Sequence, residues 1–460
     1  MTEALFLRLL GLIYLVAFGS FWPQMVGLVG SNGIEPAERV MAAIRSQLGT
    51  KAFLYFPTLF WFGISDRALV WFCILGCAAA LLLIGGFFPR SAAAVCFVLY
   101  LSLVSAGQPF TSFQWDALLL ESGFLALFAG APWLVWAYRF LLFRLMFESG
   151  VVKLLSHDPN WRNLHALRFH FMTQPLPNPI AYYAYRLPNS MLDAMTAATL
   201  AIEIGAPFLL FCPRLPRCIG ASLLMFLQLM VLLTGNYAFF NLLSLALCLW
   251  AFDDQTFAPL GRVLRRRVRP VASRILRPAL NTALALLIGI GAIQLIDMLS
   301  SGFGRPMQGP LSLVAPFQIV NTYGLFAVMT TTRPEIVIEG SNDQANWKEY
   351  SFKYKPGELH RGLPFVAPYQ PRLDWQMWFA ALGGIQENSW VSGLMYRLLL
   401  GDSRVLGLMN PPPFPKPPRF MRALLYDYQF TTTEERSRTG AVWLRQSRGI
   451  WFGPVSLNGQ

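Results

Sequence analysis

Charged residues are scarce in this sequence. Only 13% of its 460 residues are Asp, Glu, Lys or Arg, whereas soluble domains usually carry about 25% charged residues. The hydrophobic fraction is 55% and the mean hydropathy is +0.45, which together indicate lipid as the solvent. The long apolar runs lie in residues 1–300, while residues 301–460 read as an ordinary globular sequence. The sequence therefore predicts an α-helical polytopic membrane domain, residues 1–300, followed by a C-terminal all-β or β-rich, sandwich-like domain, residues 301–460.

Cysteine is absent after residue 300. The six cysteines lie in or beside apolar segments of the first part: Cys73, Cys77, Cys96, Cys212, Cys218 and Cys248. This excludes a disulfide framework in the second domain, whatever its compartment. The chain also lacks a phosphate-binding glycine loop, a CxxC pair, a helix motif with paired histidines and a Gly-x-Ser-x-Gly motif. We therefore predict no cofactor.

Acidic residues are fewer than basic ones, 24 against 37, which gives a net charge of +13. Such a balance can indicate nucleic-acid binding, but the position of the arginines argues against it. Seven arginines lie between Arg262 and Arg277, in one linker between two apolar segments. A basic loop beside a membrane span is a topological signal and attracts anionic lipid. We therefore expect membrane lipid, and no nucleic acid, as a partner.

Nine apolar segments are candidate spans, since a helix needs roughly 20 apolar residues to cross the hydrocarbon core. They are residues 5–29, 68–88, 91–106, 115–131, 137–155, 191–212, 217–234, 236–252 and 279–299. The first is too long for a removable signal peptide. The apolar stretch Phe53–Ile64 is about half a span. It is interpreted as interfacial or re-entrant, with a tenth span as the alternative.

The arginines also predict the orientation of the chain. If the loop 253–278 is cytoplasmic, every short connection with net positive charge falls on the cytoplasmic side, as the positive-inside rule expects. Those connections contain Arg90, Arg139, Arg214 and Arg217. The N-terminus is then cytoplasmic, and three segments face the lumen or periplasm: 30–67, 156–190 and 300–460.

The C-terminal domain is expected to begin after helix breakers at Gly302, Gly304, Pro306 and Pro310. Alternating patterns predict strands at 335–339 and 348–353, separated by the turn-rich stretch 340–346. Further elements are expected as helices at 375–382 and 391–400 and as strands at 423–430 and 441–444. The proline-rich run 410–418 cannot be a helix or a central strand, because proline lacks the N–H donor. We expect an extended segment there.

Charged and strongly polar side chains inside the predicted spans are the first candidates for function, because each is costly in a bilayer without a partner. They are Asp116, Glu121, Arg144, Glu148, Lys153, Glu203, Asn236 and Asn241. The structural interpretation pairs Arg144 with Glu148, which lie four residues apart on one helix. It also expects Asp116 or Glu121 to neutralise Lys153 from a neighbouring span.

A chemical interpretation centres on Lys153 at the outer end of its predicted span. A desolvated lysine can lose its charge and act as a base or nucleophile. The adjoining loop holds three of the four histidines: His157, His165 and His170. Histidine is a common metal ligand, so a metal site is one interpretation of this loop. However, His165 and His170 are five residues apart, no cysteine accompanies them, and packing or hydrogen bonding remains the simpler role. We therefore assign no metal site.

Five stretches, in order along the chain, carry a family resemblance. They are FQWDALLLESGFLA (113–126), ESGVVKLLSHDPNWRNLHALRFHFMTQPLPNP (148–179), GNYAFFNLL (235–243), IEGSNDQANWKEYSFKYKPG (338–357) and PYQPRLDWQMWFAAL (368–382). Together they resemble the lipase maturation factor family. The resemblance implies a multi-span membrane protein whose C-terminal domain faces the lumen of the endoplasmic reticulum. It also implies a role, as a chaperone rather than an enzyme, in assembling secreted lipases into active dimers.

Two further expectations follow from this resemblance. The chain has little sequence before its first span, which suggests a bacterial member in the inner membrane, with the periplasm as the outside. The partner would be a secreted, lipase-like client protein. Aromatic residues expected to be exposed on the β-rich domain are candidate contacts for that client: Trp347, Tyr350, Tyr369, Trp375 and Trp378.

A second and shorter resemblance supports an alternative function. Residues 149–154 (SGVVKL), followed by Trp161, are similar to the Ala-Gly-x-x-Lys-Leu…Trp pattern of the vitamin K-dependent γ-carboxylase superfamily. That resemblance implies that Lys153 is a catalytic base, assisted by His157, acting on a lipophilic substrate. The alternative is thus a membrane enzyme.

Overall fold

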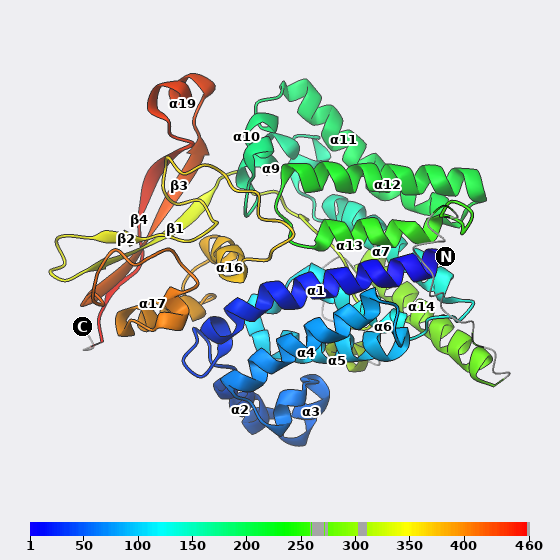
Figure 1. Ribbon diagram of the computed structural model, residues 1–460. Coiled ribbons are helices and arrows are strands. Elements are labelled where there is room, and N and C mark those ends of the chain that lie inside the picture. The colour runs from blue at the N-terminus through cyan, green and yellow to red at the C-terminus, as the bar shows by residue number, and fades with distance from the viewer. Residues whose placement is uncertain (258, 260–270, 272–274, 302–310, 458–460) are drawn as a thin grey trace.

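A computed structural model describes residues 1–257, 259, 271, 275–301 and 311–457. Its helices form a body with the N-terminus at one end, and a β-sheet lies beyond the opposite end (Figure 1). The arginines of the basic linker, apart from Arg277, lie outside the described residues, as do Gly302, Gly304, Pro306 and Pro310.

Six helical segments in the described part of the chain are long and apolar enough to cross a membrane. Two of them, α5 and α11, are extended by the short 3-10 helices η3 (Gln108–Thr111) and η4 (Ala206–Phe211). The helices are α1 (Thr2–Val29), α4 (Asp66–Ile84), α5 (Pro89–Gly107), α11 (Asn189–Gly205), α12 (Arg214–Thr234) and α14 (Leu276–Ser301). Long apolar side chains lie exposed on several of them, as expected of surfaces that face lipid.

The predicted count of nine spans is not confirmed. The other three segments form α6 (Gln114–Ala126), α7 (Leu134–Leu155) and α13 (Phe240–Cys248), which is extended by η5 (Leu249–Ala251). Helices α6 and α13 are too short for the hydrocarbon core, whereas the 22 residues of α7 reach about 33 Å at 1.5 Å per residue. However, α7 carries four charged residues and is buried along much of its length. These three helices fill the interior of the body.

Short helices make up the segments between the long ones at the sheet end. Between α1 and α4 lie α2 (Ala37–Leu48), η1 (Gly49–Lys51), α3 (Ala52–Tyr55) and η2 (Leu59–Phe62), so no tenth span is present there. Between α7 and α11 lie α8 (Pro159–Arg162), α9 (Leu167–Thr173) and α10 (Pro179–Ala184). In Figure 1, α9 and α10 lie on the side of the body nearest the sheet.

The C-terminal region contains one antiparallel sheet of four strands in the order β2-β1-β3-β4. The strands are β1 (Pro334–Ser341), β2 (Lys348–Tyr350), β3 (Phe420–Phe430) and β4 (Trp443–Val455). Strand β1 is buried along its whole length and pairs with both β2 and β3. The predicted β-rich domain is confirmed, although the described residues form one sheet rather than the two facing sheets of a sandwich.

Short helices lie before, between and after the strands β1 to β3 along the C-terminal chain. Helix α15 (Leu311–Val314) and η7 (Ala315–Phe317) come before β1, while α16 (Arg372–Ala381), α17 (Trp390–Leu400) and α18 (Ser403–Leu406) follow β2. Helix α19 (Thr433–Thr439) connects β3 to β4. Both predicted helices, 375–382 and 391–400, are thus confirmed, and the proline-rich run 410–418 forms neither helix nor strand.

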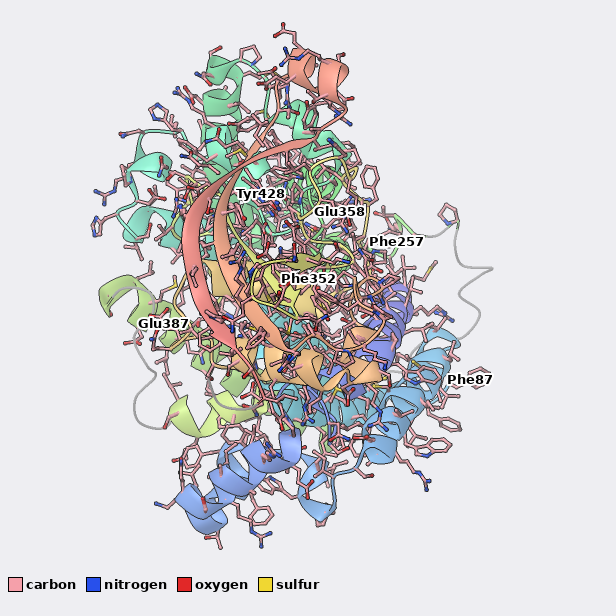
Figure 2. The ribbon with its side chains drawn as sticks, turned by 90° about the vertical axis from the view of Figure 1, so that its left-hand side faces the viewer. Phe87, Phe257, Phe352, Glu358, Glu387 and Tyr428 are labelled. Atoms are coloured by element: carbon pink, nitrogen blue, oxygen red, sulfur yellow. The ribbon has the colours of Figure 1, made fainter. Side chains whose placement is uncertain are left out.

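One hydrophobic core extends from the helical body into the C-terminal region. It includes side chains from α1, α6 and α7 together with Tyr323, Ile336 of β1 and Trp375 of α16. Figure 2, viewed from the sheet end, shows the sheet in front of the helical body, with Tyr428 and Phe352 among its labelled side chains. Because the core is continuous, the two regions pack as one unit.

Candidate functional site

Three charged residues inside the body contact the C-terminal chain: Glu121, Arg144 and Glu148. Arg144 of α7 forms an ion pair with Glu121 of α6 and donates to the Asn321 carbonyl at 2.6 Å. Glu121 also accepts hydrogen bonds from the Asn321 backbone N–H at 2.9 Å and the Tyr323 hydroxyl at 2.8 Å. Glu148 accepts from the Tyr323 backbone N–H at 2.7 Å. The segment around Asn321 and Tyr323 is therefore held within the helical body.

The predicted pairing of Arg144 with Glu148 is wrong. Glu121 provides the ion-pair partner because α6 packs beside α7, and both carboxylates are also needed by polar groups of the inserted segment. Positions four residues apart bring side chains near one another, but a buried charge takes the partner that satisfies the most hydrogen-bonding groups. That partner came from another helix.

A second buried ion pair joins α6 to the C-terminal helix α16. Arg372 donates to both carboxylate oxygens of Asp116, at 2.9 and 2.8 Å, and neither side chain is more than 1% exposed. Tyr100 donates to the same carboxylate, and the Phe110 carbonyl accepts from Arg372 at 2.8 Å. Planar, bidentate contacts of this kind are the strongest that arginine makes with a carboxylate. Asp116 is thus occupied by Arg372 and does not neutralise Lys153.

Lys153 is buried and paired within the body. Its ammonium donates to Glu203 of α11 at 2.9 and 2.7 Å and to the Ser149 carbonyl at 3.0 Å, and it lies 5.1 Å from the centre of the Trp161 ring. A lysine ammonium has three N–H donors, and these three contacts use them all. The expectation that Asp116 or Glu121 pairs with Lys153 is wrong, because α11 supplies the partner. The arrangement accounts for Lys153 and Glu203 as a structural pair.

This pairing makes a specific prediction for Lys153→Met. The change leaves the Glu203 carboxylate buried without its partner, and we expect a loss of about 3–5 kcal/mol in stability and a low yield of folded protein. The double variant Lys153→Met/Glu203→Leu removes both charges and should recover the yield. Size-exclusion chromatography and thermal unfolding in detergent measure both effects, with the exposed Lys51→Met as control. A double variant that folds normally but is inactive in an assay of the protein's function would instead assign a chemical role to Lys153.

The three loop histidines do not gather. Among the described residues no group of three or more His, Cys, Asp or Glu side chains could hold a metal ion. His170 Nε2 lies 3.1 Å from the Tyr237 hydroxyl, and His157 contacts Arg162. Burial, with a smaller contribution from the Lys153 ammonium, lowers the pKa of His170 to about 4. Its ring is therefore neutral at physiological pH and serves as a hydrogen-bonding group.

The two asparagines have different roles. Asn236 uses its whole side-chain amide: its oxygen accepts from Val366 and Ala367 N–H groups at 2.8 and 3.1 Å, and its nitrogen donates to the Leu176 and Pro364 carbonyls at 3.0 Å each. This satisfies both donors and both acceptor sites of the amide, and it attaches the C-terminal loop to the body. Asn241 donates to Gln228 at 2.8 Å and so joins α13 to α12.

Arg333, just before β1, was not identified from the sequence as a site residue. It is fully buried, forms an ion pair with Glu335 at 2.8 Å, and donates to the carbonyls of Met172 at 2.7 Å and Pro175 at 2.8 Å. Lys355 contacts the same Glu335 at 2.9 Å. The sequence did contain one signal for Arg333: it is a charged residue beside the apolar strand pattern EIVIE. Its partners are backbone carbonyls at the end of α9 and just after it, which no sequence pattern marks.

The aromatic candidates for client contact divide into two groups. Tyr350, Trp375 and Trp378 are buried, so the expectation of exposed side chains is wrong for these three, which pack in the core. Trp347 and Tyr369 are half-buried. The Trp347 ring lies 4.1 Å from the Arg422 guanidinium. These two remain candidates for contact with another protein.

These buried contacts thus attach the C-terminal region firmly to the helical body. Buried charges of α6 and α7 hold segments 318–324 and 370–374, and Asn236 and Arg333 add contacts at the same end of the body. Once desolvated, a charge must keep its partner, so the sheet cannot move freely relative to the helices. The arrangement can present a fixed surface, made from both regions, at one end of the molecule.

Comparison with known proteins agrees with this two-part construction. The family model for the lipase maturation factor transmembrane domain matches residues 1–259, and that for the lipase maturation factor C-terminal domain matches residues 319–452. Lipase maturation factor 2 of Gallus gallus is 34% identical over 98% of this chain and 80% of its own length. Lipase maturation factor 1 of Bos taurus is 33% identical over 99% of this chain and 89% of its own length. The human lipase maturation factor 1 is 32% identical, over 99% and 88%.

No solved structure matches the chain. The matched family models and these relatives are maturation factors, so the carboxylase-like alternative gains no support from them. Both matched domains occur in the expected order, and the relatives align over nearly the whole chain. The chain therefore belongs to the lipase maturation factor family.

Proposed function

We propose that this protein is a membrane-embedded maturation factor that helps secreted lipases fold and assemble. The observation that carries the proposal is the alignment of 98–99% of the chain with proteins named lipase maturation factors. Both the helical and the C-terminal parts align. The relationship therefore covers the whole protein and is not limited to one shared domain. The client is accordingly a lipase or a lipase-like secreted protein.

We place the protein in the endoplasmic reticulum membrane, or in the inner membrane of a bacterium, with the N-terminus cytoplasmic. The division proposed here is a membrane domain of residues 1–300 and a lumenal or periplasmic domain of residues 301–460. Two observations support this topology. The arginine-rich linker suits the cytoplasmic side, and contacts such as Arg397 with Gly33 and Arg333 with Met172 bring all three segments expected outside to one end. A secreted client folds on that side of the membrane.

The attachment described above explains how a membrane protein could serve this role. A client that is partly folded exposes apolar loops and unpaired strands. A fixed surface beside the membrane can hold such a client while it assembles, with no covalent chemistry. Trp347 and Tyr369 are the contact residues we propose, since aromatic side chains dominate protein interfaces.

Co-expression with a secreted lipase tests the proposal. In cells from which the endogenous maturation factor has been removed, the full chain should raise the specific activity and the dimer fraction of the secreted lipase several-fold. A secreted phosphatase serves as a client control and should not respond. Equal lipase activity with and without the chain would contradict the proposed function.

The same assay tests the two proposed contact residues, Trp347 and Tyr369, by substitution. Trp347→Ala/Tyr369→Ala should lower the gain in lipase activity, while the yield of the maturation factor itself stays unchanged. Phe88→Ala is the matched variant, because Phe88 is 76% exposed and follows α4 at the end remote from the sheet. If both variants support the lipase equally, the client contacts a different surface.

A further inference from the structure

A cleft of about 510 Å³ lies where the helical body meets the C-terminal region. Its walls come from the end of α1, the beginning of α4 and the short helix α18. The close approach of α18 depends on Gly27 of α1, since a Cβ there would lie 2.7 Å from the Arg404 carbonyl oxygen. Because α1 ends and α4 begins at this point, the cleft lies at the level where two spans leave the membrane.

The mouth of the cleft is basic. Arg67 of α4 is exposed, and Arg404 of α18 forms an ion pair with Asp66. The Asp66 carboxylate also accepts the Ser31 backbone N–H at 2.8 Å and the Ser31 hydroxyl at 3.1 Å. Two guanidinium groups and one carboxylate leave the mouth with a net positive charge. Arginine is well suited to phosphate, which it contacts through paired N–H donors.

The inner wall of the cleft is apolar and continues onto the lipid-facing side of α4. Val26 and Val70 line the wall together with Trp71, which is 56% exposed. Leu75, one turn further along α4, is 49% exposed. Residues four apart share one face of a helix, so an apolar stripe leads from the basic mouth toward the middle of the span. Tryptophan is enriched at this depth, where lipid headgroups meet the hydrocarbon region.

We propose that this cleft binds one membrane phospholipid, with its phosphate between Arg67 and Arg404 and an acyl chain along Trp71 and Leu75. A negative headgroup joined to a long apolar chain fits a basic mouth above an apolar stripe at the membrane surface. An acidic peptide would match the charge of the mouth but would leave the apolar stripe on α4 uncovered. Since Arg404 belongs to the C-terminal region and Arg67 to a span, the bound lipid connects the two regions.

The purified full chain, exchanged into a lipid-free detergent, provides the test. Dioleoyl phosphatidylglycerol is added, and bound lipid is counted by native mass spectrometry. We expect one lipid per chain and a higher unfolding temperature. Dioleoylglycerol, which lacks the phosphate, and glycerol 3-phosphate, which lacks the acyl chains, should each bind at least about tenfold more weakly, because each offers only half of the contacts. Equal binding of either compound would overturn the proposal.

Matched variants locate the site. Arg67→Glu places a negative charge beside the phosphate and should weaken phosphatidylglycerol binding about tenfold or more, while Arg39→Glu on the exposed face of α2 should change it little. Thermal unfolding without lipid checks that both variants fold. If Arg67→Glu does not fold, Arg67→Gln is used in its place. Unchanged binding by the Arg67 variant places the lipid elsewhere and overturns the proposal. The assay uses no client, so its outcome is independent of the proposed function.

Discussion

Replacing Arg372 with methionine is expected to lower the free energy of unfolding by about 3–5 kcal/mol, because it leaves a buried carboxylate without its partner. Asp116 is fully buried and accepts hydrogen bonds from both terminal nitrogens, Nη1 and Nη2, of the guanidinium. The Arg372 backbone N–H donates to Gln24 of α1 at 2.9 Å, so the same residue joins α16 to two helices of the body. The loss should therefore loosen the attachment of α16 to α6, while the backbone contact with Gln24 remains.

Thermal unfolding and hydrogen–deuterium exchange of the purified chain in detergent measure this effect. Arg438→Met, at an exposed position of α19, is the matched control and should unfold like the unchanged protein. The double variant Arg372→Met/Asp116→Leu removes both charges, and it should regain much of the lost stability because an apolar pair can replace a buried ion pair. If the single variant is as stable as the control, Arg372 does not hold the two regions together.

The second large effect is expected for Glu121→Leu. This change leaves Arg144 buried without its ion-pair partner and removes the acceptor of the Asn321 backbone N–H and the Tyr323 hydroxyl. A loss of about 3–5 kcal/mol follows from the unpaired charge alone. Because the acceptor is lost as well, the N–H of Asn321 should also lose its protection from exchange.

Hydrogen–deuterium exchange of residues 318–324 distinguishes this prediction from general destabilisation. The exchange should rise there under conditions in which α12 remains protected. Glu38→Leu, on exposed α2, provides the control for introducing leucine. Glu121→Leu/Arg144→Met should recover part of the stability while leaving the segment poorly protected, since the acceptor is still missing. Unchanged protection in the single variant would show that other contacts hold this segment.

The elements of the fold could be predicted where a single pattern in the sequence dominates. Apolar length located the six long helices, because the hydrocarbon thickness sets the same requirement for each. Alternation located β1, and the proline run excluded regular structure at 410–418. The same criterion also predicted spans at α6, α7 and α13, which are not confirmed, because a helix buried in protein is as apolar as one that faces lipid.

The partners of the charged residues could not be predicted in the same way. Asp116 and Arg372 are 256 residues apart in the chain, and Arg144 and Asn321 are 177 apart. Spacing along one helix suggested Arg144 with Glu148, but periodicity contains no information about which helices become neighbours. Three aromatic residues assigned to a surface were likewise found in the core, since large aromatic side chains occur both at interfaces and in interiors.

The sequence by itself determined that lipid surrounds the first part of this protein, that a β-rich region follows, and that the chain resembles the lipase maturation factors. Composition and local pattern suffice for these conclusions because they depend on the solvent and on neighbouring residues. Only the tertiary structure decided that Asp116, Glu121 and Asn236 hold the C-terminal region against the helices, and that Lys153 is paired with Glu203. The physical reason is that a buried charge or amide is stabilised by whichever group the fold brings within hydrogen-bonding distance, however far away that group lies in the chain.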